Sequence, residues 1–461
     1  MKPGPKVLLL NPPGEKLYIR DYYCSFSSKA DYYWPPQDLI ALSGLIGQTL
    51  PLAAIDAIIE GLNPEEVERT VLKQDFQAVV FTTGTATLAA DLALMARIKE
   101  QNHRIKIVAS AGILKFIGQE LLRRHPFLDA VLLDFTEPGI LSYLQGEANR
   151  PWPGLIYRQN GRLVASAARP PLEFSYPVPR HELFPFKRYR LPIARRFPFT
   201  VVVTSLGCPF HCAFCTAGAF GYRQRRLSNV IEELRYLKQL GVKEILFQDP
   251  TFTINTKRVV DLCQQMIAEG LDFTWSCNAE LKSLNEEKVA WMKQAGCHTV
   301  SVGIESGDEV ILKQYSKPIR AREIQDKIQL AKKYNLKILG YFIIGLPGET
   351  KESIERTIRL AKSLPLDLAS FAIATPDVGT RLRQEAIGRG LISPDLLTFD
   401  STEFPVFESP QLRREEIWSL RQKANREFYL RPSYIFKRLK EIRTIRDLKL
   451  SISNALSLFR K

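Results

Sequence analysis

Three cysteines lie close together in one predicted loop, Thr204–Cys215, which reads Thr-Ser-Leu-Gly-Cys-Pro-Phe-His-Cys-Ala-Phe-Cys. The loop follows an apolar, β-branched run, Phe199–Val203, that predicts a buried strand. Its thiols, Cys208, Cys212 and Cys215, have the spacing CxxxCxxC. A zinc site commonly takes four ligands from two cysteine or histidine pairs, and this chain offers no second pair. Three thiols so placed can instead bind three irons of a cubane cluster and leave the fourth iron open. Buried structural thiols and a zinc site are the alternatives.

At these residues the chain resembles the radical S-adenosylmethionine (SAM) superfamily. The resemblance implies a 4Fe-4S cluster on Cys208, Cys212 and Cys215, whose open iron is chelated by the amino and carboxylate groups of SAM. An electron from the cluster then cleaves SAM to methionine and a 5′-deoxyadenosyl radical. Phe214, the aromatic residue before the third cysteine, is usual in this family. His211 occupies a variable position of the family pattern, so we do not count it as a ligand.

The length of 461 residues predicts two or three domains, each with its own core. The other cysteines are scattered and predict single buried thiols rather than a disulfide framework; they are Cys24, Cys263, Cys277 and Cys297. The sequence contains neither a signal-peptide pattern nor an apolar run long enough to cross a bilayer. We therefore expect a cytoplasmic protein, in a reducing compartment that suits an iron–sulfur cluster.

The net charge of +15 is unevenly distributed, because Gln411–Lys461 carries 14 Lys and Arg against 5 Asp and Glu. Apolar residues recur in this segment at three-residue steps: Phe436, Leu439, Ile442, Ile445 and Leu448. The pattern predicts an amphipathic helix with a basic polar face. Such a helix is either strapped over the catalytic domain or in peripheral contact with an anionic membrane surface. Because the excess charge is local, we expect no nucleic-acid partner.

The N-terminal third alternates apolar strands with helices. The predicted strands are Val7–Leu10, Ala54–Ile59, Phe76–Phe81, Ile105–Ala109 and Ala130–Leu133. Alternation of this kind predicts an α/β fold with an open, doubly wound parallel sheet. Ligands of such sheets bind beyond the carboxyl ends of the strands, where this sequence places loops rich in Gly, Pro and Thr.

This third resembles the Rossmann-like cobalamin-binding domain that precedes the catalytic domain in one radical SAM class. The resemblance rests on four strand-end loops: Asn11-Pro12-Pro13, Thr82–Thr85, Ser110–Gly112 and Asp134–Pro138. It implies cobalamin contacts at Asn11, Pro12, Thr83, Gly84 and Gly112. The family's paired glycine at the fourth strand and its acidic-Gly-acidic turn at the fifth are degenerate here, and no DxHxxG motif offers a histidine to cobalt. The alternative is a sheet that has lost its ligand and serves as a docking module.

We predict four regions in the chain: a cobalamin-binding-like domain at 1–150, a hairpin and proline-rich linker at 151–195, a radical SAM core at 196–408, and a basic helical extension at 409–461. Asn160-Gly161 marks the turn of the hairpin. In the core, strands near 199–205, 244–249, 272–277, 298–303, 337–344 and 368–374 predict a partial (β/α)6 barrel. In such barrels the chemistry lies at the carboxyl ends of the strands.

The resemblance assigns SAM contacts to these strand ends. Phe247, Gln248 and Asp249 are candidates for the SAM amino group, Ser276 and Asn278 for its carboxylate or ribose, Glu305 for the ribose or sulfonium, and Ile343 and Gly345 for the adenine. The alternatives are a helix-capping role for Asp249, a helix N-terminal role for Glu305, and a plain strand–turn–helix at Gly345–Thr350.

These observations predict a radical SAM enzyme that transfers a methyl group to an unactivated carbon of a small-molecule or lipid-like substrate, with cobalamin as a further cofactor. An electron donor such as flavodoxin or ferredoxin is implied. The alternative is a radical rearrangement, cyclisation or oxidation, with or without cobalamin. A tRNA methylthio-transferase ranks lower, because that group carries extra cluster cysteines upstream and a terminal β-barrel.

Overall fold

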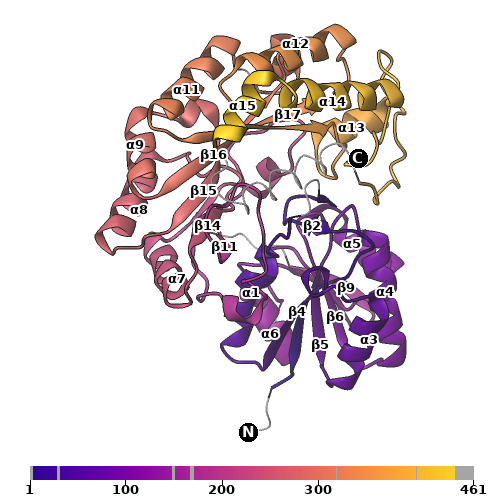
Figure 1. Ribbon diagram of the computed structural model, residues 1–461. Coiled ribbons are helices and arrows are strands. Elements are labelled where there is room, and N and C mark those ends of the chain that lie inside the picture. Colours follow the sequence, from indigo (N-terminus) through magenta and orange to yellow (C-terminus); the bar gives the residue numbers. More distant parts are fainter. Residues whose placement is uncertain are drawn as a thin grey trace.

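The computed structural model describes residues 4–28, 32–147, 151–166, 171–317, 319–400 and 402–441. The chain forms two lobes, an N-terminal lobe built on one sheet and a barrel lobe built on a second sheet (Figure 1). The lobes share a core, since Phe199, Val201 and Leu246 of the barrel belong to one apolar cluster with Val7 and Leu9 of the N-terminal sheet. Among the described helices, none combines the length and apolar character needed to cross a bilayer.

The N-terminal sheet has the strand order β4-β1-β5-β6-β7-β8-β9. Its strands are β1 Val7–Asn11, β4 Leu52–Asp56, β5 Ala78–Thr82, β6 Lys106–Ser110, β7 Ala130–Leu132, β8 Leu155–Gln159 and β9 Arg162–Ala165. The first five of this order are parallel, as the alternating pattern predicts. When these five strands are numbered by their order in the chain, they lie in the sheet in the order 2-1-3-4-5. This is one of the two common doubly wound orders.

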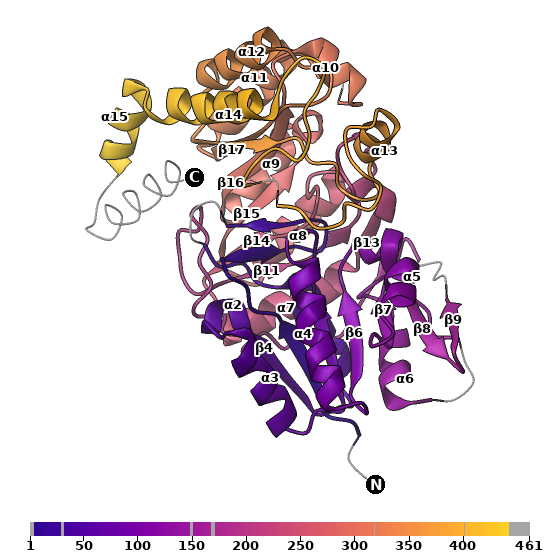
Figure 2. The ribbon, with the colours of Figure 1, turned by 90° about the vertical axis from the view of Figure 1, so that its right-hand side faces the viewer.

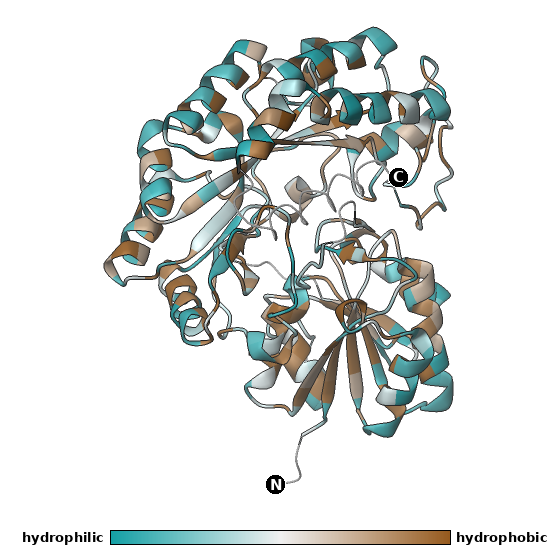
Figure 3. Ribbon diagram, viewed as in Figure 1, coloured by the Kyte–Doolittle hydropathy of each residue, from teal (hydrophilic) through white to brown (hydrophobic). Residues whose placement is uncertain are grey.

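Helices cover both faces of this sheet. They are α1 Gln37–Gly47, α2 Ala57–Glu60, α3 Pro64–Lys73, α4 Leu88–Gln101, α5 Leu114–Arg124 and α6 Gly139–Gln145. Residues of α1 and α6 share one apolar cluster with alternate strand residues, and residues of α3, α4 and α5 share the other. In Figure 3 the strands of this lobe are mostly hydrophobic and the outward surfaces of α3 and α4 are hydrophilic. The doubly wound prediction is confirmed.

Two boundaries of this lobe differ from the sequence expectation. The predicted strand Ala54–Ile59 is wrong at its end, because Asp56 accepts a hydrogen bond from Ile59 N at 3.4 Å and caps the short helix α2. The hairpin with the Asn160-Gly161 turn forms as predicted, but β8 pairs antiparallel with β7. The N-terminal sheet therefore continues to Ala165, past the predicted domain boundary.

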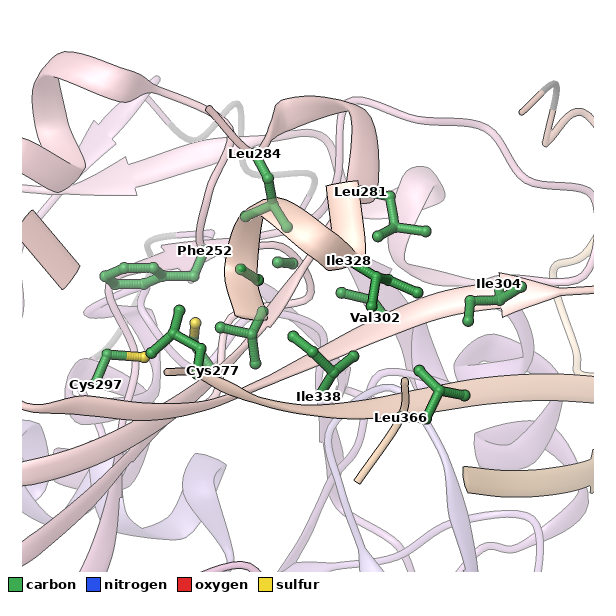
Figure 4. Packing of buried hydrophobic residues seen from close by; sticks show 14 of the residues in the cluster. Phe252, Cys277, Leu281, Leu284, Cys297, Val302, Ile304, Ile328, Ile338 and Leu366 are labelled. Atoms are coloured by element: carbon green, nitrogen blue, oxygen red, sulfur yellow. The ribbon is translucent and has the colours of Figure 1, made fainter. Parts of the chain in front are cut away.

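The barrel sheet has six parallel strands in chain order, which confirms the partial barrel. Its strands are β11 Phe199–Val202, β14 Glu244–Phe247, β15 Thr274–Ala279, β16 Cys297–Glu305, β17 Lys337–Ile344 and β18 Leu368–Ile373. Its helices are α7 Leu227–Gln239, α8 Thr256–Ala268, α9 Glu286–Gln294, α10 Glu309–Gln314, α11 Ala321–Lys333, α12 Lys351–Ser363 and α13 Arg381–Gly388. Figure 4 shows the core between strands and helices, where Cys277 and Cys297 lie among apolar side chains. Both are buried thiols, as predicted, and so is Cys263. The prediction is wrong for Cys24, which is exposed on the turn between β2 Tyr18–Arg20 and β3 Ser25–Ser27.

The C-terminal extension begins with α14 Arg414–Tyr429, which lies along the open edge of the barrel (Figure 2). The Tyr429 hydroxyl donates to Ala369 O at 2.5 Å and accepts from Ala369 N at 3.2 Å, so the helix covers unpaired backbone groups of β18. This part of the extension is a strap over the barrel. The helix α15 Pro432–Glu441 follows. Ile442, Ile445 and Leu448, which the amphipathic pattern includes, lie outside the described residues.

Candidate active site

The cluster loop, Thr204–Cys215, starts at the carboxyl end of β11 and is held on both sides. Gly207 has φ +68°, and a Cβ there would lie 1.9 Å from Gly221 O, so only glycine fits. Ala213 N donates to Tyr315 O at 3.0 Å and Ala213 O accepts from Leu382 N at 2.9 Å. These bonds fix the loop against the barrel before any cluster binds.

The three thiols of the loop lie within electrostatic range of one another. Desolvation by the surrounding protein raises the pKa of Cys215 to about 12 although its side chain is exposed, and the neighbouring Cys212 and Cys208 add to the increase. Among the described residues, no three His, Cys, Asp or Glu side chains lie close enough to share one metal ion. Three thiols that each bind a separate iron do not need to converge on one point. The arrangement of the thiols therefore does not count against a cubane cluster.

Phe214 and the adenine candidates gather on one side of the loop. Phe214 and Ile343 are partly buried, and both pack against an apolar cluster that contains Leu346 and Ala213. Phe214 and Ile343 of β17 therefore share one apolar cluster.

Asp249 lies at the end of β14, but its carboxylate faces the cluster loop. It accepts hydrogen bonds from Thr204 N at 2.7 Å, from Thr204 Oγ1 at 2.5 Å and from Ser205 Oγ at 2.8 Å. The expectation that this carboxylate binds the SAM amino group is therefore replaced by a role in holding the start of the loop. The capping alternative also fails, since Asn255 caps α8 by accepting from Arg258 N at 3.1 Å.

The other candidates on β14 and β15 differ in their contacts within the protein. Some side chains are already packed or hydrogen-bonded, and others carry polar atoms that a ligand could bind. Phe247 is fully buried and stacks on Phe252 with ring centroids 4.9 Å apart, so only its backbone can face SAM. Asn278 Nδ2 donates to Asp249 O at 3.0 Å. In contrast, Ser276 Oγ and Gln248 Oε1 are buried polar atoms that have no hydrogen-bond partner among the residues that the structure describes. Such atoms are costly unless a ligand or water satisfies them, which fits a SAM site.

Glu305 ends β16 at a register shift and has φ +67°, an unusual backbone conformation for a residue with a side chain. Its Oε1 lies 3.3 Å from Lys317 Nζ, and the two side chains are only 10% and 14% exposed. Gly303 leaves room for the pair, because a Cβ there would lie 2.1 Å from Glu305 Oε1. The helix alternative for Glu305 is wrong, since Asp308 caps α10 by accepting from Val310 N at 2.9 Å.

Sequence reasoning missed Lys317. Burial alone would lower the pKa of this lysine, but Glu305, Cys212 and Glu280 raise it above its ordinary value, so it stays charged. It therefore places a cation between the cluster loop and the end of β16. The sequence offers one signal for this residue, which is a lysine shortly after the Gly-Ile-Glu-Ser-Gly string. Only the fold shows that the chain comes back to Glu305 at this lysine.

Glu349 shapes the adenine loop after β17. Gly345 has φ +89°, and its N–H and that of Leu346 donate to Glu349 Oε2 at 2.7 and 3.0 Å. Burial raises the pKa of this carboxyl to about 8, although the two N–H groups oppose the increase. The Gly-Leu-Pro-Gly-Glu-Thr string therefore has a physical reason: its glutamate ties down the backbone at its first glycine.

We expect the free energy of unfolding of the protein to fall as the pH rises from about 4.5 to about 8, because of the Glu349 carboxyl. Over that range the folded protein keeps a proton on Glu349 that the unfolded chain has lost, so unfolding becomes easier with rising pH. Glu349→Gln cannot lose a proton, so its free energy of unfolding should fall less than that of the wild type between about pH 5.5 and about pH 8. Denaturant unfolding at both pH values measures the difference. Glu352→Gln, at an exposed site in the first turn of the helix that follows, should behave like the wild type.

The candidate cobalamin contacts on the loops of the N-terminal sheet lie in two different places, and the first pair lies inside the lobe. Asn11 Nδ2 donates to Asp56 Oδ1 at 2.8 Å, and the buried Arg20 donates to Asn11 Oδ1 at 2.9 Å and to Pro12 O at 2.8 Å. Arg20 is itself paired with Asp91 at 2.7 Å. The polar groups of Asn11 and Pro12 are therefore hydrogen-bonded inside the lobe. They do not line the cavity described next, contrary to their assignment as cobalamin contacts.

Thr83, Gly84 and Gly112 do line a cavity, which lies between the two lobes. The other walls of this interdomain cavity come from the turn Asp21–Cys24, from Thr216 and Phe220 after the cluster loop, and from Asp377 and Val378. The free volume enclosed in this cavity is about 20 Å³. That is far below the volume of a pocket for a drug-sized ligand, about 300–1,000 Å³. The lining fits a corrinoid in position, and the space must widen to admit one.

Comparison with known proteins decides the family. The model of the radical SAM superfamily matches residues 202–361, a range that contains the cluster loop and the SAM candidates described above. An uncharacterized methyltransferase of Pyrococcus horikoshii is 35% identical over 448 residues, which cover 94% of each chain. The chain belongs to the radical SAM superfamily. It is therefore an enzyme of the class that uses SAM and an iron–sulfur cluster, as predicted.

One further relative and one solved structure cover most of the chain. The anaerobic magnesium-protoporphyrin IX monomethyl ester cyclase of Rubrivivax gelatinosus is 27% identical, over 91% of this chain and 78% of its own. The structure of TsrM, a radical SAM methyltransferase of Kitasatospora setae with cobalamin and a 4Fe-4S cluster bound, superposes with a TM-score of 0.68 at 15% identity, over 90% of this chain and 91% of that one. The second likeness shows the two-lobe fold alone.

Proposed function

We propose that this radical SAM enzyme transfers a methyl group to an unactivated carbon of a small-molecule or lipid-like substrate and that it depends on cobalamin. The observation that carries the proposal is the interdomain cavity, which strand-end loops of the N-terminal sheet share with the segment after the cluster loop. The methyltransferase name of a relative that matches 94% of this chain supports the reaction. The cobalamin bound in TsrM, which has the same fold, supports the cofactor.

When bound, the cluster supplies the electron that cleaves SAM and cobalamin supplies a carrier for the methyl group. The residues of this chain position the reactants. Lys317 faces the SAM carboxylate, Glu305 offsets the positive sulfonium or binds the ribose, and the Ser276 hydroxyl donates to an oxygen of SAM. The backbone at Gly345 receives the adenine. Burial of this set excludes water from the reacting atoms.

Lys317→Met should weaken SAM binding about tenfold or more, since a partly buried charge-assisted hydrogen bond contributes about 1.5–3 kcal/mol. The loss of its partner also leaves Glu305 buried without a cation. Equilibrium binding of SAM to the reconstituted enzyme measures the change. Lys313→Met, on the exposed side of α10 four residues earlier, is the matched control and should bind SAM normally. Equal affinity of the two variants for SAM would show that Lys317 does not bind SAM.

We propose that the interdomain cavity widens on the side of Asp377 and Val378. Within the described chain, the hydrogen bonds of this turn are local: Thr380 N donates to Asp377 O at 3.1 Å, and Arg383 donates to Pro376 O at 3.2 Å. The opposite wall, Asp21–Cys24, is bonded to both lobes. We therefore place the entry of the corrinoid on the Asp377 side.

A cyclisation or other radical rearrangement is the second candidate, which the similarity to the Rubrivivax gelatinosus cyclase favours. The two reactions differ in how they consume SAM. With reduced cobalamin bound and no other substrate added, a methyltransferase converts SAM to S-adenosylhomocysteine in an amount equal to the bound cobalt. A rearrangement enzyme forms none. Chromatography of the products after anaerobic incubation therefore separates the proposals, and an absence of S-adenosylhomocysteine would contradict methyl transfer.

The electron donor, a flavodoxin or ferredoxin, docks in our proposal at the tip of the cluster loop. Pro209 and His211 are exposed there, and Phe210 is 41% exposed, so an apolar contact surface lies beside the thiols. The short distance from this tip to the cluster suits electron transfer.

We also propose that α15 contacts an anionic membrane surface. Four large apolar side chains in and just before this helix are 43–61% exposed: Leu430, Ile435, Phe436 and Leu439. Arg438 and Lys440 place positive charge beside them. The variant Phe436→Ser with Leu439→Ser should lose most sedimentation with vesicles that contain phosphatidylglycerol. Val310→Ser, 73% exposed on α10, is the control. Equal sedimentation of both variants would contradict the contact.

A further inference from the structure

We infer that Tyr23, in the N-terminal lobe, is a positioning residue for the iron–sulfur cluster. The inference rests on the radical SAM function and adds a residue from outside the barrel to it. Tyr23 belongs to the turn Asp21–Cys24, which joins β2 Tyr18–Arg20 to β3 Ser25–Ser27. Figure 1 shows β2 at the end of the N-terminal lobe that faces the barrel.

Tyr23 binds both ends of the segment that carries the thiols. Its hydroxyl accepts a hydrogen bond from Gly207 N at 2.8 Å, and its backbone carbonyl accepts from Thr216 Oγ1 at 3.1 Å. Gly207 directly precedes Cys208, and Thr216 directly follows Cys215. One residue therefore fixes the separation of the two ends of the thiol segment.

The turn that carries Tyr23 is itself rigid. Asp21 N donates to Cys24 O at 2.9 Å, and Cys24 N donates to Asp21 O at 3.2 Å. Gly112 N donates to Tyr22 O at 2.9 Å, and a Cβ on Gly112 would lie 2.2 Å from that oxygen. The side chain of Gln248 donates to the Asp21 carboxylate. The turn is thus bonded at once to the N-terminal sheet, to the cluster loop and to the strand beside it.

Aromatic packing and a lysine hydrogen bond hold the residues that follow the thiol segment. Phe220, shortly after the cluster loop, lies between Tyr22 and Tyr23 with ring centroids 5.4 and 5.3 Å away, and Phe116 of α5 is 6.0 Å away. Lys115 Nζ donates to Ala219 O at 2.6 Å. The N-terminal lobe therefore contacts the residues on both sides of the thiol segment, and Tyr23 makes the contacts nearest to the thiols at both ends.

The Tyr23 hydroxyl also acts on the charge near the cluster. Burial raises the pKa of Tyr23 far above its ordinary value, so the hydroxyl stays neutral and its oxygen accepts the Gly207 N–H. Without that oxygen the positive end of the N–H dipole is no longer balanced. N–H groups near the cluster sulfurs favour the reduced, more negative cluster and raise its reduction potential.

The test compares Tyr23→Phe with Tyr22→Phe, which removes a hydroxyl from the same turn. The Tyr22 hydroxyl donates to Leu133 O at 2.7 Å, away from the cluster loop. The reduction potential of the reconstituted cluster is titrated anaerobically and followed by electron paramagnetic resonance. We expect Tyr23→Phe to change the reduction equilibrium up to about tenfold, which is about 59 mV for one electron, toward a higher potential. Tyr22→Phe should keep the wild-type potential.

A second pair of variants tests the carbonyl contact without touching Tyr23. Thr216→Val cannot donate to Tyr23 O and should release iron to a chelator several-fold faster than the wild type. Thr216→Ser keeps the hydroxyl and should restore the wild-type rate. Wild-type potential in Tyr23→Phe, or equal shifts in Tyr23→Phe and Tyr22→Phe, would overturn the inference. A wild-type protein that assembles no cluster would instead contradict the proposed function.

Discussion

Replacement of Cys208, Cys212 or Cys215 by alanine abolishes the cluster and with it the cleavage of SAM. In the proposed assignment each thiolate binds its own iron, so the loss of one leaves a second iron without a protein ligand and opens the cluster to solvent. The three positions are equivalent in this respect, because all lie on one loop that the barrel fixes through Ala213. We expect each variant to lose the broad iron–sulfur absorbance and to form no 5′-deoxyadenosine above background.

The matched control for this prediction is Cys263→Ala. Cys263 is a fully buried thiol of α8 in the barrel core, far in sequence from the loop. Its replacement should leave the iron content and SAM cleavage at the wild-type level, with a small loss of packing. A cluster that survives alanine at Cys208, Cys212 or Cys215 would contradict the assignment of the ligands.

Asp249→Ala should lower the free energy of unfolding by about 3 kcal/mol and disorder the start of the cluster loop. The carboxylate accepts three hydrogen bonds from Thr204 and Ser205, and each buried donor left without a partner costs about 1–3 kcal/mol. Chemical denaturation of the protein measures the stability, and iron analysis after reconstitution reports on the loop. Asp272→Ala, at an exposed site, should change stability by less than about 0.5 kcal/mol.

The same variant separates two roles of Asp249. If the carboxylate binds the SAM amino group, Asp249→Ala weakens SAM binding while the stability of the protein and its iron content stay normal. If it holds the loop, as the hydrogen bonds indicate, stability and iron content fall together. Normal stability with lost SAM affinity would therefore restore the role that the strand-end position suggests.

The sequence allowed the layout of this enzyme to be predicted because its signals are local. The spacing of Cys208, Cys212 and Cys215, the apolar strand runs, and the Asn160-Gly161 turn each depend on neighbouring residues. Both sheets and the partial barrel follow from such signals. The attachment of the hairpin to β7 does not, because strand pairing across a turn and a helix leaves no mark in the local pattern.

Residue roles at the site were harder to predict because they depend on distant partners. Asp249 lies at a strand end, as SAM ligands do, but Thr204 and Ser205 use its carboxylate from 45 and 44 residues away. Asn11 and Pro12 follow a strand, but Arg20 fills the space beside them. Lys317 comes to Glu305 from beyond α10. For Asp249, Asn11 and Pro12 the backbone position was predicted correctly and the tertiary contact decided what the side chain does, whereas Lys317 was not predicted at all.

The measurement that tests the central claim most directly is anaerobic reconstitution of the full chain with iron, sulfide and hydroxocobalamin, followed by absorbance spectra and iron and cobalt analysis. We predict a broad iron–sulfur band, about four irons per chain and nearly one cobalt per chain. A cluster without cobalt would leave a radical SAM enzyme whose N-terminal lobe only braces the cluster loop, and would favour rearrangement chemistry. A chain that binds no iron would contradict the account as a whole.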